Sequence, residues 1–176
     1  LLSILHNGMR ECYSGDIFVA AFYRQNEESF LEGIVKGLEY FGGTPQKIIF
    51  DNARVAVKEG FGHHAKATDK YLALSAHYSF RPVFCNPAQG HEKGLVRRNA
   101  FVPMPNISTI EELNAKLLEH CSMYRSHKIS GKNMTVGEMA ENCKEHWIPL
   151  PPYRFDPSNT IQIKADDFSL VRFDHN

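Results

Sequence analysis

Hydrophobic and polar residues follow a strand pattern at the start of the chain and a helical pattern further on. Residues 1–24 are rich in strand-forming side chains, and the run 17–23 (IFVAAFY) predicts a strand. Turn-forming residues precede this run at 14–16 (SGD) and also occur at 6–8 (HNG). The pattern therefore predicts a β-rich opening with a turn at each of these two places.

The next stretch, NEESFLEGIVKGLEYFGG, predicts an amphipathic helix. Asn26 can cap its start, the two glutamates that follow suit the positive end of the helix dipole, and Gly42-Gly43 ends it. One face of this helix is apolar and is expected in the core: Phe30, Leu31, Ile34, Val35, Leu38 and Phe41.

Strands and helices then alternate. KIIF (47–50) predicts a short buried strand, and a helix over about 65–78 leads to the strand 81–85 (RPVFC). Capping-box patterns predict a helix from about 109 and a short one from 135. This order of elements favours an α/β fold in which helices cover a mixed sheet.

The texture of the chain changes after about residue 148. IPLPPYRFDP is proline-rich and extended, and TIQIKADDFSLVRF alternates like two small strands. We therefore expect a core over 1–130, a helical and proline-rich linker over 131–152, and the beginning of a small β-module over 153–176.

Composition narrows the class of protein. With 176 residues and 43% hydrophobic content, the chain can bury one core and a small appendage. No stretch approaches the roughly 18 apolar residues that cross a bilayer, and no signal-peptide pattern opens the chain. Four cysteines without a CxxC pair favour reduced, mostly buried thiols in a cytoplasmic protein. Equal numbers of basic and acidic residues, 20 of each, count mildly against a nucleic-acid partner but allow a local positive strip.

Candidate chemistry lies at the ends of two predicted strands. Asp51 directly follows KIIF, and α/β folds bind ligands outside the carboxyl ends of their strands. A plain Asp-Asn turn formed with Asn52 is the alternative, because both residues favour turns. Position alone favours the turn.

The second strand end is followed by NPAQGHEKG. Asn86-Pro87 ends the strand because proline cannot continue the ladder, and Gly90 permits close backbone approach. His91 begins what looks like a helix, whose free N–H groups together with Lys93 could seat a phosphate. Taken alone, such a cluster is more often a plain loop.

Together these stretches resemble a known family. IIFDN, HYSF and FCNPAQGHEKGLV are similar to the integrase-core transposases of the DDE type, and most of all to the IstA family of two-gene insertion sequences. The resemblance extends to YSGDIFVAAFYRQNEESFLEGIVKGLEYFGG, NARVAVKEGFG, YRSHKI, TVGEM and PLPPYRFDP, and so covers nearly the whole chain.

The resemblance implies a ribonuclease-H-like fold in which two aspartates and one glutamate hold two Mg²⁺ (or Mn²⁺) ions. Two such ions, roughly 4 Å apart, clamp the attacking and leaving oxygens of a phosphodiester, and they prefer hard oxygen ligands. Asp51 matches the second aspartate and is the expected catalytic and metal-binding residue. Asn52 and Asn86 match positions beside the metal ions.

Two acidic residues of the family pattern are missing. The first aspartate has no match, and its expected place is before Leu1; Asp16 is rejected because it lies in a turn. The glutamate normally follows GLV, but here Val96 is followed by Arg97. Glu92 cannot replace it, because five residues turn a helix by roughly 140° and put it on the wrong face.

Two explanations of the missing glutamate are open. Either this is a catalytically inactive copy, or the printed sequence omits residues at Val96–Arg97, where both flanks keep the family pattern. The second explanation is favoured, and a similar omission is expected near Gly8–Met9.

Basic residues near the predicted site could line a path for DNA by pairing with phosphates, although a solvated surface explains them equally well. These residues are Arg81, Lys93, Arg97 and Arg98. His91 and Glu92 lie close enough to shape the site or to touch DNA. Lys66 and Lys70 are expected on one solvated helix face.

The resemblance implies metal-dependent cleavage and strand transfer at insertion-sequence ends. Its implied partners are transposon-end and target DNA, further copies of the chain, and an AAA+ ATPase helper, with no membrane. The expected location is the prokaryotic cytoplasm, at the nucleoid when DNA is bound. The alternatives are an inactive remnant that binds DNA or supports assembly, and a ribonuclease-H-like nuclease that cuts without joining.

Overall fold

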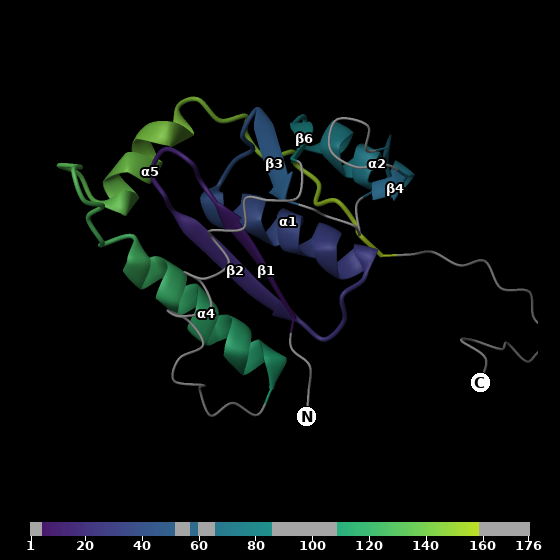
Figure 1. Cartoon of the computed structure of the whole chain (residues 1–176), viewed down its shortest axis with the longest axis horizontal. Coiled ribbons are helices and arrows are strands. Elements are labelled where there is room, and N and C mark those ends of the chain that lie inside the picture. The colour runs from purple at the N-terminus through teal and green to yellow at the C-terminus, as the bar shows by residue number, and fades with distance from the viewer. Residues whose placement is uncertain (1–4, 52–56, 60–65, 86–108, 159–176) are drawn as a thin grey trace, which may run out of the picture.

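The computed structural model describes residues 5–51, 57–59, 66–85 and 109–158 (Figure 1). Strands and helices alternate along these residues. In chain order they are β1 (Leu5–Arg10), β2 (Ile17–Phe22), α1 (Glu27–Phe41), β3 (Lys47–Asp51), β4 (Val57–Glu59), β5 (Lys66–Ala67), α2 (Asp69–His77), β6 (Arg81–Cys85), α4 (Ile110–Tyr124) and α5 (Val136–Lys144).

The first two strands form an antiparallel pair. β1 pairs with β2 from Leu5↔Phe22 to Arg10↔Ile17 without a register shift, which confirms the strand predicted at 17–23. The turn predicted at 6–8 is wrong, because these residues belong to β1 and pair with β2. The strand also passes through Gly8–Met9, where an omission was expected, in regular register.

The turn between these strands covers 11–16 and is held by one side chain. The Glu11 carboxylate accepts hydrogen bonds from the backbone N–H of Tyr13 and from both the N–H and the hydroxyl of Ser14. Gly15 has a positive φ of 74°, and a side chain there would meet Ile129. The turn predicted at 14–16 is therefore present.

Helix α1 has the predicted caps and the predicted apolar face. The Asn26 side chain accepts a hydrogen bond from Ser29 N at 2.9 Å, and Gly42 ends the helix in the left-handed conformation with φ 76°. Of the six predicted core residues, Phe30 is half-buried against the core. The other five are buried: Leu31, Ile34, Val35, Leu38 and Phe41.

A parallel pair forms the second sheet. β3 and β6 run side by side from Lys47↔Arg81 to Asp51↔Cys85, and α2 precedes β6. α2 begins at Asp69 rather than near 65, because the Thr68 side chain caps it and Lys66–Ala67 pair with β4 instead. Residues of α1, β3 and α2, together with Tyr78 and Phe80, form one buried cluster.

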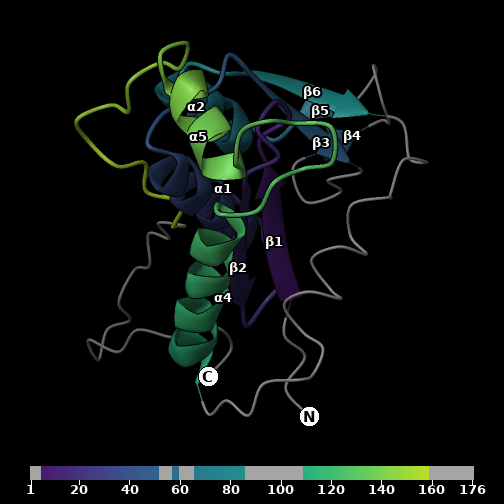
Figure 2. The same ribbon diagram turned by 90° about the vertical axis from the view of Figure 1, so that its left-hand side faces the viewer.

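Strand β2 is buried on both faces. Ile17, Val19 and Ala21 pack against α4, whereas Phe18 and Ala20 pack with Phe41 of α1. α4 runs alongside β2 in both views (Figures 1 and 2). β2 thus lies between helices, which agrees with the predicted α/β fold.

α1 is the element common to the β1–β2 and β3–β6 pairs. Its buried face joins the cluster of β3 and α2, and Phe41 at its end joins the cluster of β2. α5 begins with a complete capping box, in which Thr135 and Glu138 each bond the other's backbone. Among the described residues, no helix is long and apolar enough to cross a membrane.

Candidate functional site

The backbone brings the two predicted strand ends to one edge. Asp51 is the last residue of β3, and it pairs with Cys85, the last residue of β6. Because the two strands are parallel, the chain leaves both at the same edge of the sheet, the position at which α/β folds bind ligands. This edge is the candidate site.

The other residues predicted for this edge lie outside the described residues. They are Asn52, Asn86, Pro87, Gly90, His91, Lys93, Arg97 and Arg98. Glu92 also lies there, so the shared pocket expected between Asp51 and the segment after Asn86-Pro87 stays a prediction. Arg81 is described: it is exposed and pairs with Lys47 at the opposite end of the strands, away from the candidate edge.

An aromatic cluster supports the candidate edge from below. Phe50 and Phe84, the residues just before Asp51 and Cys85, contact the ring of Tyr71 at centroid distances of 5.3 and 5.8 Å. Tyr71 lies in the first turn of α2, so this end of the helix packs beneath the carboxyl ends of β3 and β6. The edge therefore rests on an aromatic cluster in which Phe50 and Tyr71 are buried and Phe84 is partly buried.

The Tyr71 hydroxyl is buried and has no hydrogen-bond partner among the described residues. Burial raises the pKa of Tyr71 well above its ordinary value. The phenol is therefore neutral and is not suited to accept or give up a proton at physiological pH.

The face of β3 that bears Ile49 is exposed to solvent. Ile48 and Phe50 are buried in the core, but Ile49 between them is 58% exposed. A large apolar residue exposed in a parallel strand is unusual, because such strands are generally covered on both faces.

The described residues do not by themselves complete a metal site. Among them, no group of three or more His, Cys, Asp or Glu side chains lies close enough to hold a metal ion. The predicted ligand Asp51 is of the residue type whose hard oxygen donors Mg²⁺ prefers, but a cage would require further oxygen ligands. The residues at hand therefore fit a divalent ion only in part.

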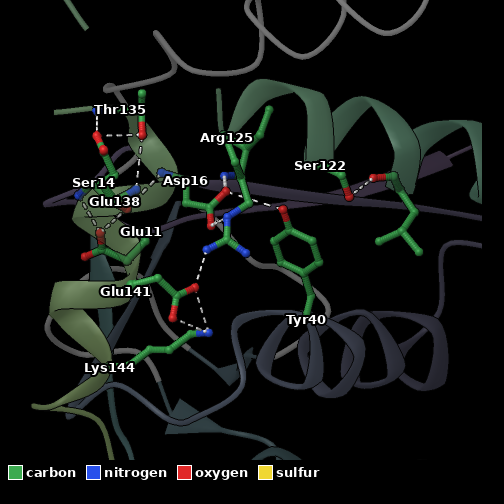
Figure 3. A network of polar contacts seen from close by, with 12 residues as sticks. Glu11, Ser14, Asp16, Tyr40, Ser122, Arg125, Thr135, Glu138, Glu141 and Lys144 are labelled. Atoms are coloured by element: carbon green, nitrogen blue, oxygen red, sulfur yellow. Dashed lines mark hydrogen bonds and ion pairs between the residues drawn. The ribbon is translucent and has the colours of Figure 1, made fainter. Parts of the chain in front are cut away.

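Asp16, which the sequence analysis rejected as a catalytic residue, is held by neighbouring groups (Figure 3). Its carboxylate is 2% exposed, accepts a hydrogen bond from Ile17 N at 2.9 Å and one from the Tyr40 hydroxyl at 3.4 Å, and lies 3.5 Å from Arg125 Nε. Burial raises the pKa of Asp16, and the charge of Arg125 opposes this rise.

Arg125 connects this carboxylate to the last helix (Figure 3). Its Nη2 donates to Glu141 Oε1 at 2.6 Å, and Glu141 also pairs with Lys144 at 3.0 Å. The group therefore joins the turn between β1 and β2, the end of α4 and the middle of α5. With all its charges paired, it has the character of a structural clamp.

The sequence analysis found the segment YRSHKI but did not assign this function to its arginine. Arg125 caps the end of α4, and its partners lie more than 100 positions earlier at Asp16 and 16 positions later at Glu141. Asp16 was the residue in the sequence that could have pointed to this ion pair, because a carboxylate that becomes buried requires a positively charged partner.

The chain is similar to curated transposases. A transposase of Aminobacter aminovorans is 35% identical over 148 residues, which cover 80% of this chain and 28% of that protein. The transposase for IS1326/IS1353 of Pseudomonas aeruginosa is 30% identical over 148 residues, or 79% of this chain and 29% of that protein. The IS21 transposase of the same species is 27% identical over 154 residues, or 83% and 40%. The chain thus spans less than half the length of these relatives.

Solved structures show the same fold at low sequence identity. The catalytic core domain of HTLV-2 integrase, in its trimeric form with magnesium, has a TM-score of 0.55 at 11% identity and covers 78% of this chain and 92% of that one. A chain in the structure of the simian T-cell lymphotropic virus intasome in complex with PP2A regulatory subunit B56 gamma also has a TM-score of 0.55, at 16% identity, over 91% of this chain and 58% of that one.

No model of a known protein family matches the chain. The fold is nevertheless ribonuclease-H-like, as in the integrase cores, which confirms the predicted fold class. The sequence likeness to curated transposases over about 80% of the chain confirms the predicted family. The chain belongs to the IstA-type transposases of IS21-like insertion sequences.

Proposed function

We propose that the chain contains part of the catalytic core of a transposase that cuts insertion-sequence ends and joins them to target DNA. The position of Asp51 carries the proposal: this aspartate, the match to the second acidic residue of the family, ends a strand at the edge where two parallel strands terminate. Kinship with transposases and the integrase-core fold support the same chemistry.

The proposed reaction requires a divalent ion. In our proposal the Asp51 carboxylate supplies one ligand, and the other two acidic ligands of the family pattern have no match in the printed sequence. A bound Mg²⁺ or Mn²⁺ pair would stabilise charge on the attacking and leaving oxygens of the phosphodiester. The HTLV-2 integrase core, which shares the fold, was solved in complex with magnesium.

The proposed partners are those of DNA transposition. They comprise transposon-end DNA, target DNA, further copies of the chain and an AAA+ ATPase helper, in the prokaryotic cytoplasm at the nucleoid. The HTLV-2 integrase core has been solved in dimeric and trimeric forms, which supports self-association in this fold.

A joining assay tests the proposal. The full chain is incubated with Mg²⁺, a pre-cut end duplex and a supercoiled target plasmid, and joined products are counted. Asp51→Asn is expected to abolish joining, since an amide binds the ion far more weakly than a carboxylate. The matched control, Glu119→Gln, removes an exposed carboxylate of α4 and is expected to leave the yield unchanged. Cutting without joining by the unmodified chain would favour a nuclease instead.

An inactive remnant is the second candidate function, because Arg97 follows Val96 where the family has a glutamate. Intact mass and peptide sequencing across Val96–Arg97 decide between the two explanations. A mass that agrees with the 176 printed residues, together with no joining, would assign the chain to DNA binding or assembly alone.

A further inference from the structure

The segment 148–158, which spans the end of the expected linker (131–152) and the start of the expected β-module (153–176), is attached along the core. It begins at a short antiparallel bridge in which Thr44 and Ile148 exchange two backbone hydrogen bonds of 2.8 and 2.9 Å. Thr44 lies just before β3, so the segment starts at the end of the sheet opposite to Asp51. We call residues 148–158 the strap.

The middle of the strap is attached to α1 and α2. Arg154 donates from Nε to Glu39 and from Nη2 to Glu32, both at 2.8 Å, and so grips two turns of α1. The neighbouring residue Phe155 packs on the buried core, and its N–H bonds the Tyr78 hydroxyl at 3.3 Å. The backbone oxygen of Tyr153 lies 2.8 Å from His77 Nε2, although the Tyr153 side chain is 79% exposed.

The end of the strap is attached to the first turn of α2. Lys70 Nζ donates to the backbone oxygens of Pro157 and Ser158, each at 2.6 Å. The next residue, Tyr71, is the one that packs beneath Phe50 and Phe84 at the carboxyl ends of β3 and β6. The strap therefore runs from the amino end of β3 to the edge where Asp51 lies.

We propose that the strap is a positioning device, which makes the chain leave the core beside the candidate catalytic edge, with Arg154 and Lys70 as its two attachments. The inference rests on the proposed function, because it takes DNA to bind at that edge. DNA that reaches Asp51 then meets the end of the strap. An extended segment without helix or strand bonds needs such side-chain attachments to hold one course.

The first test measures attachment without any DNA. Glu32→Gln/Glu39→Gln removes both charges that grip Arg154 and leaves the strap sequence unchanged. Chymotrypsin cleavage after Tyr153 or Phe155 is expected to accelerate about fivefold, because proteolysis follows the population of the detached strap and two partly exposed ion pairs are lost. The matched control, Glu111→Gln/Glu119→Gln on α4, is expected to cleave like the unmodified chain, and circular dichroism checks that each variant is folded.

The second test measures position against DNA. A photoreactive p-benzoylphenylalanine replaces Ser158 or, as a control, Met123, which is 59% exposed on α4. Irradiation with a radiolabelled pre-cut duplex is expected to label DNA from position 158 several times more than from position 123. Lys70→Met and Glu32→Gln/Glu39→Gln are each expected to reduce the labelling from position 158.

The outcomes separate the strap from the proposed reaction. Equal cleavage of the glutamate variant and its control, or equal labelling from positions 158 and 123, overturns the inference. A third outcome is that the unmodified chain joins no DNA and still shows protection of the strap from chymotrypsin and DNA labelling from position 158. That result would support the strap and would count only against the proposed catalytic function.

Discussion

At the scale of single residues, Tyr71 supports the candidate edge but lowers the stability of the fold through its hydroxyl group. Its ring packs against Phe30, Phe50, Phe80 and Phe84, but its buried hydroxyl lacks a partner among the described residues. A buried hydroxyl that loses its bonds to water without replacing them lowers stability.

Tyr71→Phe is therefore expected to raise the free energy of unfolding by about 1 kcal/mol, because it removes only the unpaired hydroxyl. Tyr78→Phe is the matched control: its hydroxyl accepts the Phe155 N–H, so the same change should lower the free energy of unfolding by about 1 kcal/mol. Urea denaturation of both variants measures the difference. A loss of stability in Tyr71→Phe would mean that the hydroxyl has a partner.

At the scale of elements, the Asp16–Arg125–Glu141 group holds the turn between β1 and β2 against α4 and α5. Arg125 is the member whose removal leaves Asp16 buried without its cation. A buried pair contributes little in total, but the loss of one partner costs more than the pair contributed.

Arg125→Met is expected to lower the free energy of unfolding by about 2 kcal/mol near neutral pH. A carboxyl whose pKa is raised by folding stabilises the fold fully below its unfolded value and loses that contribution as pH rises through the folded value. Because burial already raises the pKa of Asp16 and Arg125 opposes this rise, the variant should lose least stability at acidic pH.

Urea titrations at neutral pH and near 3.8, the ordinary pKa of aspartate, measure this dependence. Asp16→Asn/Arg125→Met is the control, since a neutral amide does not need the cation, and its loss should be smaller and independent of pH. An equal loss in both backgrounds would show that Arg125 acts through packing alone.

The helices and the strands β2, β3 and β6 could be predicted from local pattern, whereas pairing between strands formed β1, β4 and β5. Asn26 and Thr135 cap their helices as the sequence indicated, and Thr109 caps α4, for which a start at about 109 was predicted. The turn predicted at 6–8 failed because pairing with β2 keeps these residues extended, and the start of α2 moved because Lys66–Ala67 pair with β4. Such pairing depends on residues distant in the sequence, which turn propensity does not include.

At the scale of the whole molecule, α1 joins the β1–β2 and β3–β6 pairs into one core. Leu38 is fully buried in the cluster that α1 shares with β3 and α2, and Phe41 three residues later packs with β2. Because α1 contacts both of these strand pairs, we expect the two pairs to unfold together.

Leu38→Ala is expected to lower the free energy of unfolding by about 3 kcal/mol, since it leaves a cavity in a packed core. Leu118→Ala, at a half-exposed leucine of α4, is the control and should cost about 1 kcal/mol or less. Hydrogen exchange should accelerate in β1–β2 and β3–β6 alike. Faster exchange confined to one sheet would contradict a single cooperative core.

The candidate site could be predicted from sequence only as far as the order of the strands. Asp51 at the end of a strand beside a second strand end was predicted, and the parallel pairing with Cys85 agrees with it. The attachment of the strap by Arg154 was not predicted, because Glu32 and Glu39 lie more than 100 positions away and proline-rich composition indicates only an extended chain.

The packing of α4 along β2 also limits how copies of the molecule can associate. Both backbone groups of Ala21 are bonded by the Asn114 side chain, at 2.7 and 3.0 Å, and the backbone of Val19 bonds the Cys121 sulfur. These side chains occupy the outer margin of the hairpin, the place where an added strand from another molecule would dock. Addition of a strand from another molecule is therefore blocked on that side of the hairpin.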